Sequence, residues 1–304
     1  MWRIWICALF WGLNWPAVRI ALDGFSPWTL RAAGLSLGAM LLMALAVALS
    51  RSLVVPAGHR GALVISAALN VAGFNIFIVF AQLAMPSSRA AILTFTMPMW
   101  AALFAALFAG ERIDRIRGMA LALGAAGLCL LARPYWPALA SGTIPLGLVY
   151  VLGAAILWAA GTVYAKVRAI PGDPLGLTAW QLVIGALIAG AGALAFEAPR
   201  IDFTVPGVTG AFAYHVLLAI AAAYFLWFEL LSRVPSSTAA IGTLLIPIVA
   251  LIGSMLILGE RPTLTDFIGF GFILAGIAMD QGFRQLASRS APTADRIKPP
   301  HLGS

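Results

Sequence analysis

Long apolar runs make up most of the chain, and short clusters of glycine, proline and charged residues separate them. Each run is about twenty residues long, which is the length that an α-helix needs to cross the hydrocarbon core of a bilayer. A transmembrane β-barrel would instead require segments of about ten residues with alternating polarity. The pattern predicts an all-α integral membrane protein with ten transmembrane helices, at residues 4–22, 28–50, 60–82, 87–110, 115–133, 145–166, 174–196, 207–231, 236–259 and 264–286.

The composition agrees with a membrane protein. Charged residues form 10% of the chain and hydrophobic residues 62%, whereas soluble domains contain about 25% charged residues. The first apolar run differs from a cleavable signal peptide, because Asn14 and Pro16 interrupt it and no small-residue cleavage site precedes Asp23. We therefore expect this run to remain in the mature protein as the first transmembrane helix.

The two halves of the chain carry the same motifs at an offset of 149 residues. Residues 86–92 read Pro-Ser-Ser-Arg-Ala-Ala-Ile, and residues 235–241 read Pro-Ser-Ser-Thr-Ala-Ala-Ile. The same offset places Gly110-Glu111-Arg112 on Gly259-Glu260-Arg261. We therefore predict two five-helix repeats, at residues 1–138 and 139–287, and a disordered cytoplasmic tail at residues 288–304. Because five is an odd number, the second repeat enters the membrane from the opposite side and the repeat is inverted.

The basic residues predict how the chain crosses the membrane. With the N-terminus inside, thirteen of the 19 Lys and Arg residues lie in cytoplasmic segments, as the positive-inside rule requires. This places both termini in the cytoplasm of a multi-pass protein in the plasma membrane, which is the inner membrane in a bacterium. The basic residues are spread along loops and do not form one face with stacking aromatics, so nucleic acid is not an expected partner.

Several motifs, in their order along the chain, carry a resemblance to a known family. Trp11-Gly12-x-Asn14 precedes Arg19 in the first helix, and Trp158-Ala159 precedes Lys166 in the sixth. Pro27 and Pro174 open the second and seventh helices, and Gly-Glu-Arg closes the fourth and ninth. From residue 4 to about residue 286, the chain resembles the EamA-type branch of the drug/metabolite transporter superfamily. The resemblance implies ten helices in two inverted repeats and secondary export of small metabolites, often amino acids. The sixth helix departs from the pattern, because Gly161 stands where the first helix has Asn14.

Two prolines lie near the middle of their predicted helices. Pro98 and Pro247 each remove the backbone hydrogen bond to the carbonyl four residues earlier, which belongs to Thr94 and Thr243 respectively. A functional interpretation is that the kinked helices present these carbonyls and hydroxyls to a polar substrate. The alternative is that the threonine side chains or neighbouring helices satisfy the carbonyls and the kinks serve packing.

Aromatic and amide side chains provide further candidates for a substrate site. Trp11, Trp15 and Trp100 fall at bilayer depth, where an indole N–H needs a partner, and Trp158 is a weaker candidate of the same kind. Packing in the core or against lipid explains them equally well. In the third helix, two amides seven residues apart share one face and suit either a polar cavity or interhelical hydrogen bonds. These amides are Asn75 and Gln82.

Ionisable residues are rare inside the predicted helices. His215 could relay a proton, although a lone histidine is more often a hydrogen-bonded structural residue. Glu111 and Glu260 are expected to end helices and to pair with the arginine that follows each. Arg19, Arg31 and Lys166 could attract a carboxylate, but their positions near helix ends favour snorkelling to the interface.

The sequence offers no support for an enzyme. Hydrolase, metalloprotease and phosphate-loop motifs are missing, and we expect neither a catalytic residue nor a cofactor nor a metal. We predict a secondary transporter that exports small amphiphilic metabolites by alternating access, with amino acids favoured by the resemblance and aromatic ones by the tryptophans. A carrier of lipophilic drugs is the alternative, followed by a channel or scaffold. The predicted substrate-site residues are Trp11, Asn14, Trp15, Asn75, Gln82, Thr94, Pro98, Trp100, Trp158, Thr243 and Pro247, with His215 as the candidate for proton coupling.

Overall fold

The computed structural model describes residues 2–231 and 243–290, which form helices and contain no β-strand. An isolated β-bridge joins Phe25 to Ile201. The first half contains α1 (Trp2–Gly24), α2 (Pro27–Ala48), η1 (Ala57–His59), α3 (Arg60–Ala67), η2 (Ala68–Gly73), α4 (Phe74–Ala84), α5 (Ser87–Thr94), α6 (Met97–Phe108), α7 (Arg115–Ala132), η3 (Arg133–Tyr135) and α8 (Trp136–Ala140). The second half contains α9 (Leu146–Arg168), α10 (Pro174–Phe196), α11 (Val208–Ala213), η4 (Tyr214–Ala222), α12 (Ala223–Leu231), α14 (Leu245–Leu258) and α15 (Leu264–Ser290).

Together these elements confirm the prediction of an all-helical membrane protein. Within the described residues, nine helical stretches are long and apolar enough to cross a membrane, and α14 is a shorter apolar helix. The ninth span, predicted at residues 236–259, lies partly outside the described residues. Helix α15 continues to Ser290 and so includes the first three residues of the predicted tail. The rest of the tail, from residue 291 onward, lies outside the described residues.

The starts of α2 and α10 show how the sequence sets helix boundaries. Pro27 and Pro174 each occupy the first position of a helix, where proline has a suitable φ and its missing N–H leaves no hydrogen bond unmade. Asp173 precedes α10, and its carboxylate accepts hydrogen bonds from the N–H groups of Leu175 (2.9 Å) and Gly176 (3.3 Å). This N-cap satisfies two donors that the helix itself cannot pair.

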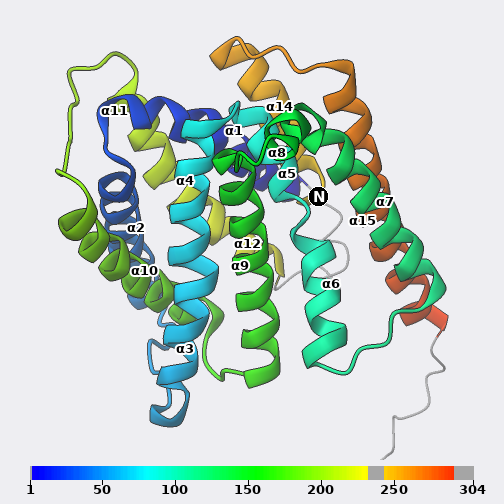
Figure 1. Cartoon of the computed structure of the whole chain (residues 1–304). Coiled ribbons are helices and arrows are strands. Elements are labelled where there is room, and N and C mark those ends of the chain that lie inside the picture. The colour runs from blue at the N-terminus through cyan, green and yellow to red at the C-terminus, as the bar shows by residue number, and fades with distance from the viewer. Residues whose placement is uncertain (1, 232–242, 291–304) are drawn as a thin grey trace, which may run out of the picture.

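Helices from different halves of the chain pack side by side. Helices α7 and α15 run together along one edge of the molecule, and α4, α9 and α6 stand next to one another (Figure 1). The pairs α2 with α10 and α1 with α14 also make extensive contacts. Close approach of α7 and α15 depends on glycine, because a Cβ at Gly127 would lie 2.6 Å from the carbonyl oxygen of Gly269. A Cβ at Gly276 would likewise lie 2.6 Å from the carbonyl oxygen of Ala120.

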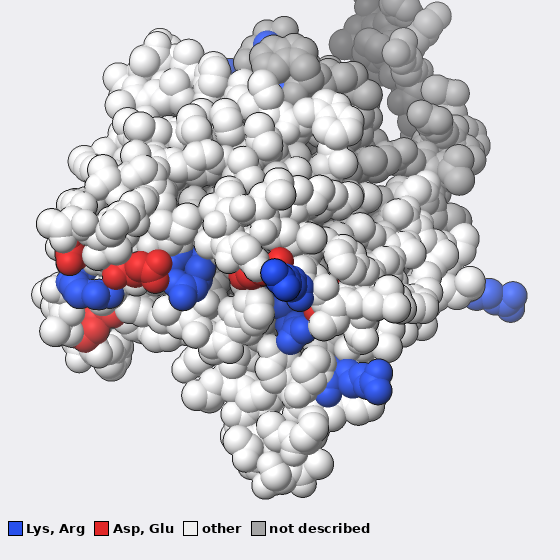
Figure 2. Space-filling view, turned by 90° about the horizontal axis from the view of Figure 1, so that it is seen from above, with Lys and Arg blue, Asp and Glu red and all other residues white. Residues whose placement is uncertain are grey.

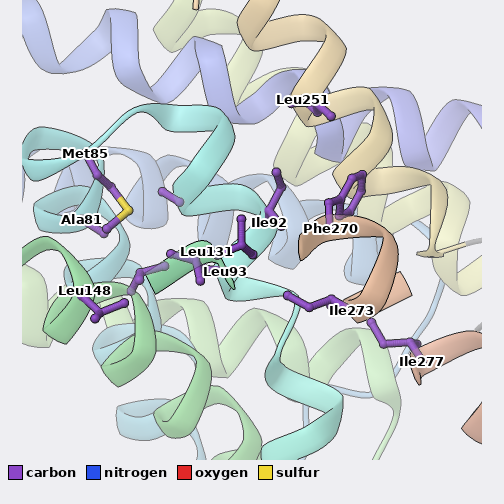
Figure 3. Packing of buried hydrophobic residues seen from close by; sticks show 12 residues of the cluster. Ala81, Met85, Ile92, Leu93, Leu131, Leu148, Leu251, Phe270, Ile273 and Ile277 are labelled. Atoms are coloured by element: carbon purple, nitrogen blue, oxygen red, sulfur yellow. The ribbon is translucent and has the colours of Figure 1, made fainter. Parts of the chain in front are cut away.

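The largest buried cluster joins both halves. Figure 3 shows side chains from α4, α5, α7, α9, α14 and α15 meeting in it, among them Ile92, Leu93, Leu131 and Phe270. Large apolar side chains are also strongly exposed on the outside of the bundle, as at Leu194, which is 83% exposed. Many large apolar side chains are exposed in this way, and such an apolar surface agrees with a bilayer around the bundle.

Two segments are wound more widely than an α-helix. Both η2 (Ala68–Gly73) and η4 (Tyr214–Ala222) are π-helical and lie within longer helical stretches. The offset of 149 that aligns the repeated motifs places Ala68–Gly73 on residues 217–222, which fall inside η4. Turns of this kind break the regular hydrogen-bond ladder of a helix and recur at functional sites.

Candidate functional site

The fourth predicted transmembrane helix is broken in its middle. Helix α5 ends at Thr94 and α6 starts at Met97, so Pro98 occupies the first turn of a new helix. The hydroxyl of Thr94 donates to the carbonyl of Ala90 (2.7 Å), and that of Thr96 donates to the carbonyl of Leu93 (2.8 Å). The side chain of Thr94 is therefore buried and engaged within its own helix, and the expected kink is a break.

Trp100 lies on the α6 side of this break. Its indole N–H donates to the hydroxyl of Thr96 (3.2 Å). Thr96 and Pro98 also border a cavity of about 30 Å³ between α6, α7 and α15, to which Arg117 and Asp280 contribute. This volume is far below the roughly 300–1,000 Å³ of typical ligand pockets.

The corresponding part of the second half is more apolar. Helix α14 begins at Leu245, so Pro247 again falls in the first turn, and it is buried whereas Thr243 is half-buried. The offset of 149 places Trp100 on Val249. Val249 packs so closely on α1 that a Cβ at Gly12 would lie 2.5 Å from the Cβ of Val249.

Helix α1 contacts η4 through polar groups deep in the bundle. The Oδ1 atom of Asn14 lies 2.8 Å from Nδ1 of His215, which is only 3% exposed. The indole N–H of Trp11 donates to the carbonyl of Ala219 (3.0 Å). Three of the predicted site residues are thus brought together at one helix contact, and the wide turns of η4 supply the carbonyl acceptor.

Helix α9 makes the corresponding contact with η2, but the polar side chain comes from the other partner. Nδ2 of Asn70 in η2 donates to the carbonyl of Trp158 (2.7 Å) and to the hydroxyl of Thr162 (2.9 Å). A Cβ at Gly161 would lie 2.8 Å from this Nδ2 atom. The predicted site left out Asn70. The sequence signal for it is Gly161, which stands where α1 has Asn14 and leaves space for a side chain from another helix.

The remaining amides have partners within the protein. Nε2 of Gln82 donates to the carbonyl of Trp15 (3.0 Å) and to the hydroxyl of Ser87 (3.0 Å), so it joins α4 to α1 and α5. Nδ2 of Asn75 donates to the carbonyl of Val71 in its own helical stretch (2.8 Å). Trp15 packs against the large buried cluster. These contacts favour the interhelical and packing interpretation of the three side chains.

Glu260 binds the start of α5. Its carboxylate accepts hydrogen bonds from the N–H groups of Ser87 (2.6 Å) and Ser88 (2.9 Å), where the helix dipole favours negative charge. Beside it, Arg89 forms a two-pronged ion pair with Asp266, each N–O distance being 3.0 Å. Seen from above, acidic and basic side chains lie next to each other in small groups with uncharged surface between them (Figure 2).

Glu111 has different partners, although it belongs to the same repeated motif. Its carboxylate accepts hydrogen bonds from Lys166 (2.8 Å) and Arg117 (3.0 Å). The hydrogen bond from Lys166, followed by that from Arg117, holds the pKa of Glu111 below its usual value. The sequence led us to expect that Glu111 and Glu260 each pair with the arginine that follows. In the structure neither of them does.

Arg31 is buried instead of snorkelling to the interface. It is 3% exposed, whereas Arg19 is partly exposed and pairs with Asp23 (2.8 Å). The prediction that Arg31 reaches the interface is wrong, because its position in the second turn of α2 faces other helices.

Neither the cavity beside Pro98 nor the one between α2 and η4 contains all the predicted site residues. They fall instead into a group at the contact of α1 with η4, a group packed around α4 and α5, and groups at the break between α5 and α6 and at the start of α14. Within the described residues, no cluster of three His, Cys, Asp or Glu side chains could hold a metal ion. The groups are, in that order, Trp11, Asn14 and His215; Trp15, Asn75, Gln82 and Thr94; and Pro98, Trp100, Thr243 and Pro247, with Trp158 at the contact of α9 with η2.

The apolar helices, the broken fourth helix and the buried polar contacts between helices define a multi-pass membrane protein of the transporter class. The chain belongs to the EamA-like transporter family, whose family pattern matches residues 2–133 and 145–279. A solved crystal structure has the same fold, with a TM-score of 0.64, 18% sequence identity and coverage of 93% of this chain and 97% of its own.

Curated relatives match along nearly their whole length. The uncharacterized transporter YvbV of Bacillus subtilis is 28% identical over 89% of this chain and 88% of its own. A probable terminal-alkyne amino-acid exporter of Streptantibioticus cattleyicolor is 24% identical over 92% of both chains. A probable amino-acid metabolite efflux pump of Escherichia coli is 25% identical over 90% of this chain and 91% of its own.

Proposed function

We propose that this transporter exports small amphiphilic metabolites, amino acids above all, by alternating access. The observation that carries the proposal is the discontinuous helix formed by α5 and α6, with Pro98 in the first turn after the break. Discontinuous transmembrane helices leave backbone groups near the midplane for a substrate, and they mark the binding sites of many secondary transporters. The proposed site comprises this break, the corresponding break before α14, and the contact of α1 with η4.

The proposal includes an inverted repeat of ten transmembrane helices. Repeats at residues 1–138 and 139–287 would exchange conformations about a pseudo-twofold axis, so that the site opens alternately to either side. The sequence-equivalent positions of η2 and η4 support this arrangement. Both termini would lie in the cytoplasm of a plasma-membrane protein. A single cysteine at Ser141, in a background without Cys7 and Cys129, should then react with an impermeant thiol reagent on intact cells.

Two relatives with amino-acid transport in their names support the choice of substrate. The indole N–H groups of Trp11 and Trp100 have partners within the protein, and the ring of Trp11 also contacts the rings of Tyr224 and Trp227. We propose that this aromatic group and Trp100 contact an apolar side chain of the substrate. Uptake and efflux in proteoliposomes, measured with a panel of amino acids, nucleosides and cationic dyes, tests the proposal. Saturable transport of dyes alone would replace the amino-acid exporter by a carrier of lipophilic drugs.

We further propose that His215 couples transport to protons. His215 lies buried at the contact of α1 with η4, and imidazole is the side chain that most often relays protons in proteins. His215→Ala should retain exchange of substrate across the membrane but lose the dependence of net transport on a pH gradient. Unchanged pH-gradient dependence in the variant would assign His215 a structural role only.

A further inference from the structure

Arg31 differs from the other buried arginine of the described residues in having no carboxylate partner. Arg117 is 8% exposed and contacts both Glu111 (3.0 Å) and Asp280 (3.4 Å). Arg31 is 3% exposed, its Nε atom has no hydrogen-bond partner, and it takes part in none of the ion pairs found among the described residues. Glu197 approaches the preceding turn of α2, where its carboxylate binds the backbone N–H groups of Trp28 and Thr29.

The side of α2 that carries Arg31 faces η4. Gly34 and Gly38 follow Arg31 at helical spacing, and added Cβ atoms at these two positions would lie 2.8 Å from Nε2 of His215 and 2.6 Å from Ile220. Arg31 is therefore one turn away from the position where α2 touches the imidazole of His215. The Nε2 atom of His215 is itself buried without a hydrogen-bond partner. Two unpartnered polar groups thus lie on the same buried contact between α2 and η4.

Such an arrangement is unfavourable unless a ligand completes it. A buried guanidinium without a counter-ion loses its hydration and gains no compensating charge interaction. Ionisable groups inside a membrane therefore mark ligand or ion pathways when no protein partner neutralises them. Among anions, a carboxylate matches the planar donors of arginine through two parallel hydrogen bonds.

We propose that Arg31 binds the carboxylate of the transported metabolite, at a site between α2, α1 and η4. Asn14 and His215 form the adjacent wall, and the anion supplies the counter-charge that the protein does not provide. The identity of the ligand as an amino acid rests on the proposed function, whereas its negative charge follows from the burial of Arg31. We therefore expect the protein to transport acids and to bind the corresponding carboxamides less tightly.

The test compares aromatic ligands that differ at the carboxyl group. L-Phenylalanine, phenylacetate and L-phenylalaninamide are titrated into the purified full-length protein, and apparent Kd values are obtained from the ligand-induced rise in melting temperature. The wild type should bind at least one of the two acids at least about tenfold more tightly than the amide, because charge-assisted hydrogen bonds exceed the 1.4 kcal/mol that tenfold represents. Arg31→Gln should abolish this preference, and Arg31→Lys should keep part of it. Arg19→Gln, which removes a partly exposed arginine, is the matched control and should behave as the wild type.

A second measurement separates a binding role from a structural one. Without ligand, Arg31→Gln should melt at the same temperature as the wild type or higher, because the substitution removes an uncompensated buried charge. A lower melting temperature, or a wild type that binds neither acid more tightly than the amide, would overturn the proposal. If phenylacetate binds through Arg31 but phenylalanine does not, the anion site stands and the amino-acid substrate falls. If phenylalanine is transported but shows no preference over its amide, the amino-acid substrate stands and the anion site falls.

Discussion

Two helix contacts at corresponding places in the two halves use opposite partners for their polar group. At the first contact, α1 supplies Asn14 to His215 of η4. At the second, η2 supplies Asn70 to the backbone and hydroxyl of α9, and Gly161 provides the space for it. Both contacts therefore join a regular helix to a π-helical segment, but the asparagine stands on the regular helix in the first contact and on the π-helical segment in the second.

Under the proposed function, the second contact serves structure and the first serves binding. Asn70 makes two hydrogen bonds from a single amide nitrogen, so the second contact provides partners for the side chain that crosses it. The first contact leaves Nε2 of His215 without a partner and lies one helical turn from the unpaired Arg31. Unsatisfied buried polar groups destabilise a resting structure, and proteins retain them mainly where a ligand binds.

Filling the space at Gly161 should break the structural contact. A methyl group there would lie 2.9 Å from the backbone nitrogen of Asn70, which cannot move away as a side chain could. We expect Gly161→Ala to destabilise the protein by about 1–3 kcal/mol through overpacking, measured by thermal unfolding of the purified protein. Gly190→Ala is the control, because no atom lies within 4 Å of its added Cβ and alanine favours the helix. Equal melting temperatures for the two variants would contradict the close contact.

Removing the amide from each contact sharpens the comparison. Asn70→Ala should lower stability by about 0.6–2 kcal/mol, the range for hydrogen bonds between membrane helices, while the remaining protein keeps transporting. Asn14→Ala leaves Nδ1 of His215 unpaired beside the proposed site and should slow transport about tenfold, which corresponds to 1.4 kcal/mol in the activation barrier. Transport in proteoliposomes and melting temperature are measured on the same samples. Parallel losses of both quantities in the two variants would remove the distinction.

The two halves also differ near the starts of α6 and α14, where the first half has an aromatic residue and the second half an aliphatic one. Trp100 follows the first break, and the equivalent Val249 packs against Gly12 of α1. Trp100→Ala should weaken apparent substrate affinity by about 0.5–1.5 kcal/mol beyond the loss of buried area, since an aromatic contact with the substrate is lost. Val249→Ala should mainly lower the melting temperature, because it leaves a cavity beside α1.

The same pair of breaks can be tested through Pro98. Pro98→Ala restores a backbone N–H group in the first turn of α6, so the helix can continue across the break. The variant should therefore transport more slowly, while its melting temperature stays equal or rises. If Trp100→Ala transports with unaltered affinity and Pro98→Ala behaves as the wild type, the first break serves packing alone.

The smallest effect is expected at Glu111, whose counterpart Glu260 binds backbone groups and not cations. Because its pKa is lowered in the folded protein, Glu111 contributes stability above the unfolded pKa of about 4.3, and loses it as the pH falls through the folded value. Glu111→Gln should therefore remove up to about 1 kcal/mol at neutral pH and less below pH 4. Melting temperatures of wild type and variant between pH 3 and 7 measure this, and a gap that does not change with pH would exclude the ion pair as its source.

The sequence by itself determined that the chain is a bundle of membrane helices of the EamA-like type. Apolar runs of bilayer length report the solvent directly, because every backbone group in lipid must be paired within a helix. Local rules also placed Pro27 and Pro174 at helix starts. The repeated motifs located Pro98 and Pro247, although they did not distinguish a kink from the break that the structure contains.

Only the tertiary structure decided what the polar side chains contact. Asn14 meets His215, Glu260 meets Ser87, and Arg31 is buried instead of reaching the interface, through neighbours that lie far away in the chain. The repeat could not predict these partners, because Asn14 corresponds to Gly161, and Glu111, which corresponds to Glu260, binds Lys166 and Arg117 instead of backbone groups. In a bundle whose helices are all apolar, the hydrogen bonds of a few polar groups depend on which helices meet, and that is set by packing over the whole molecule.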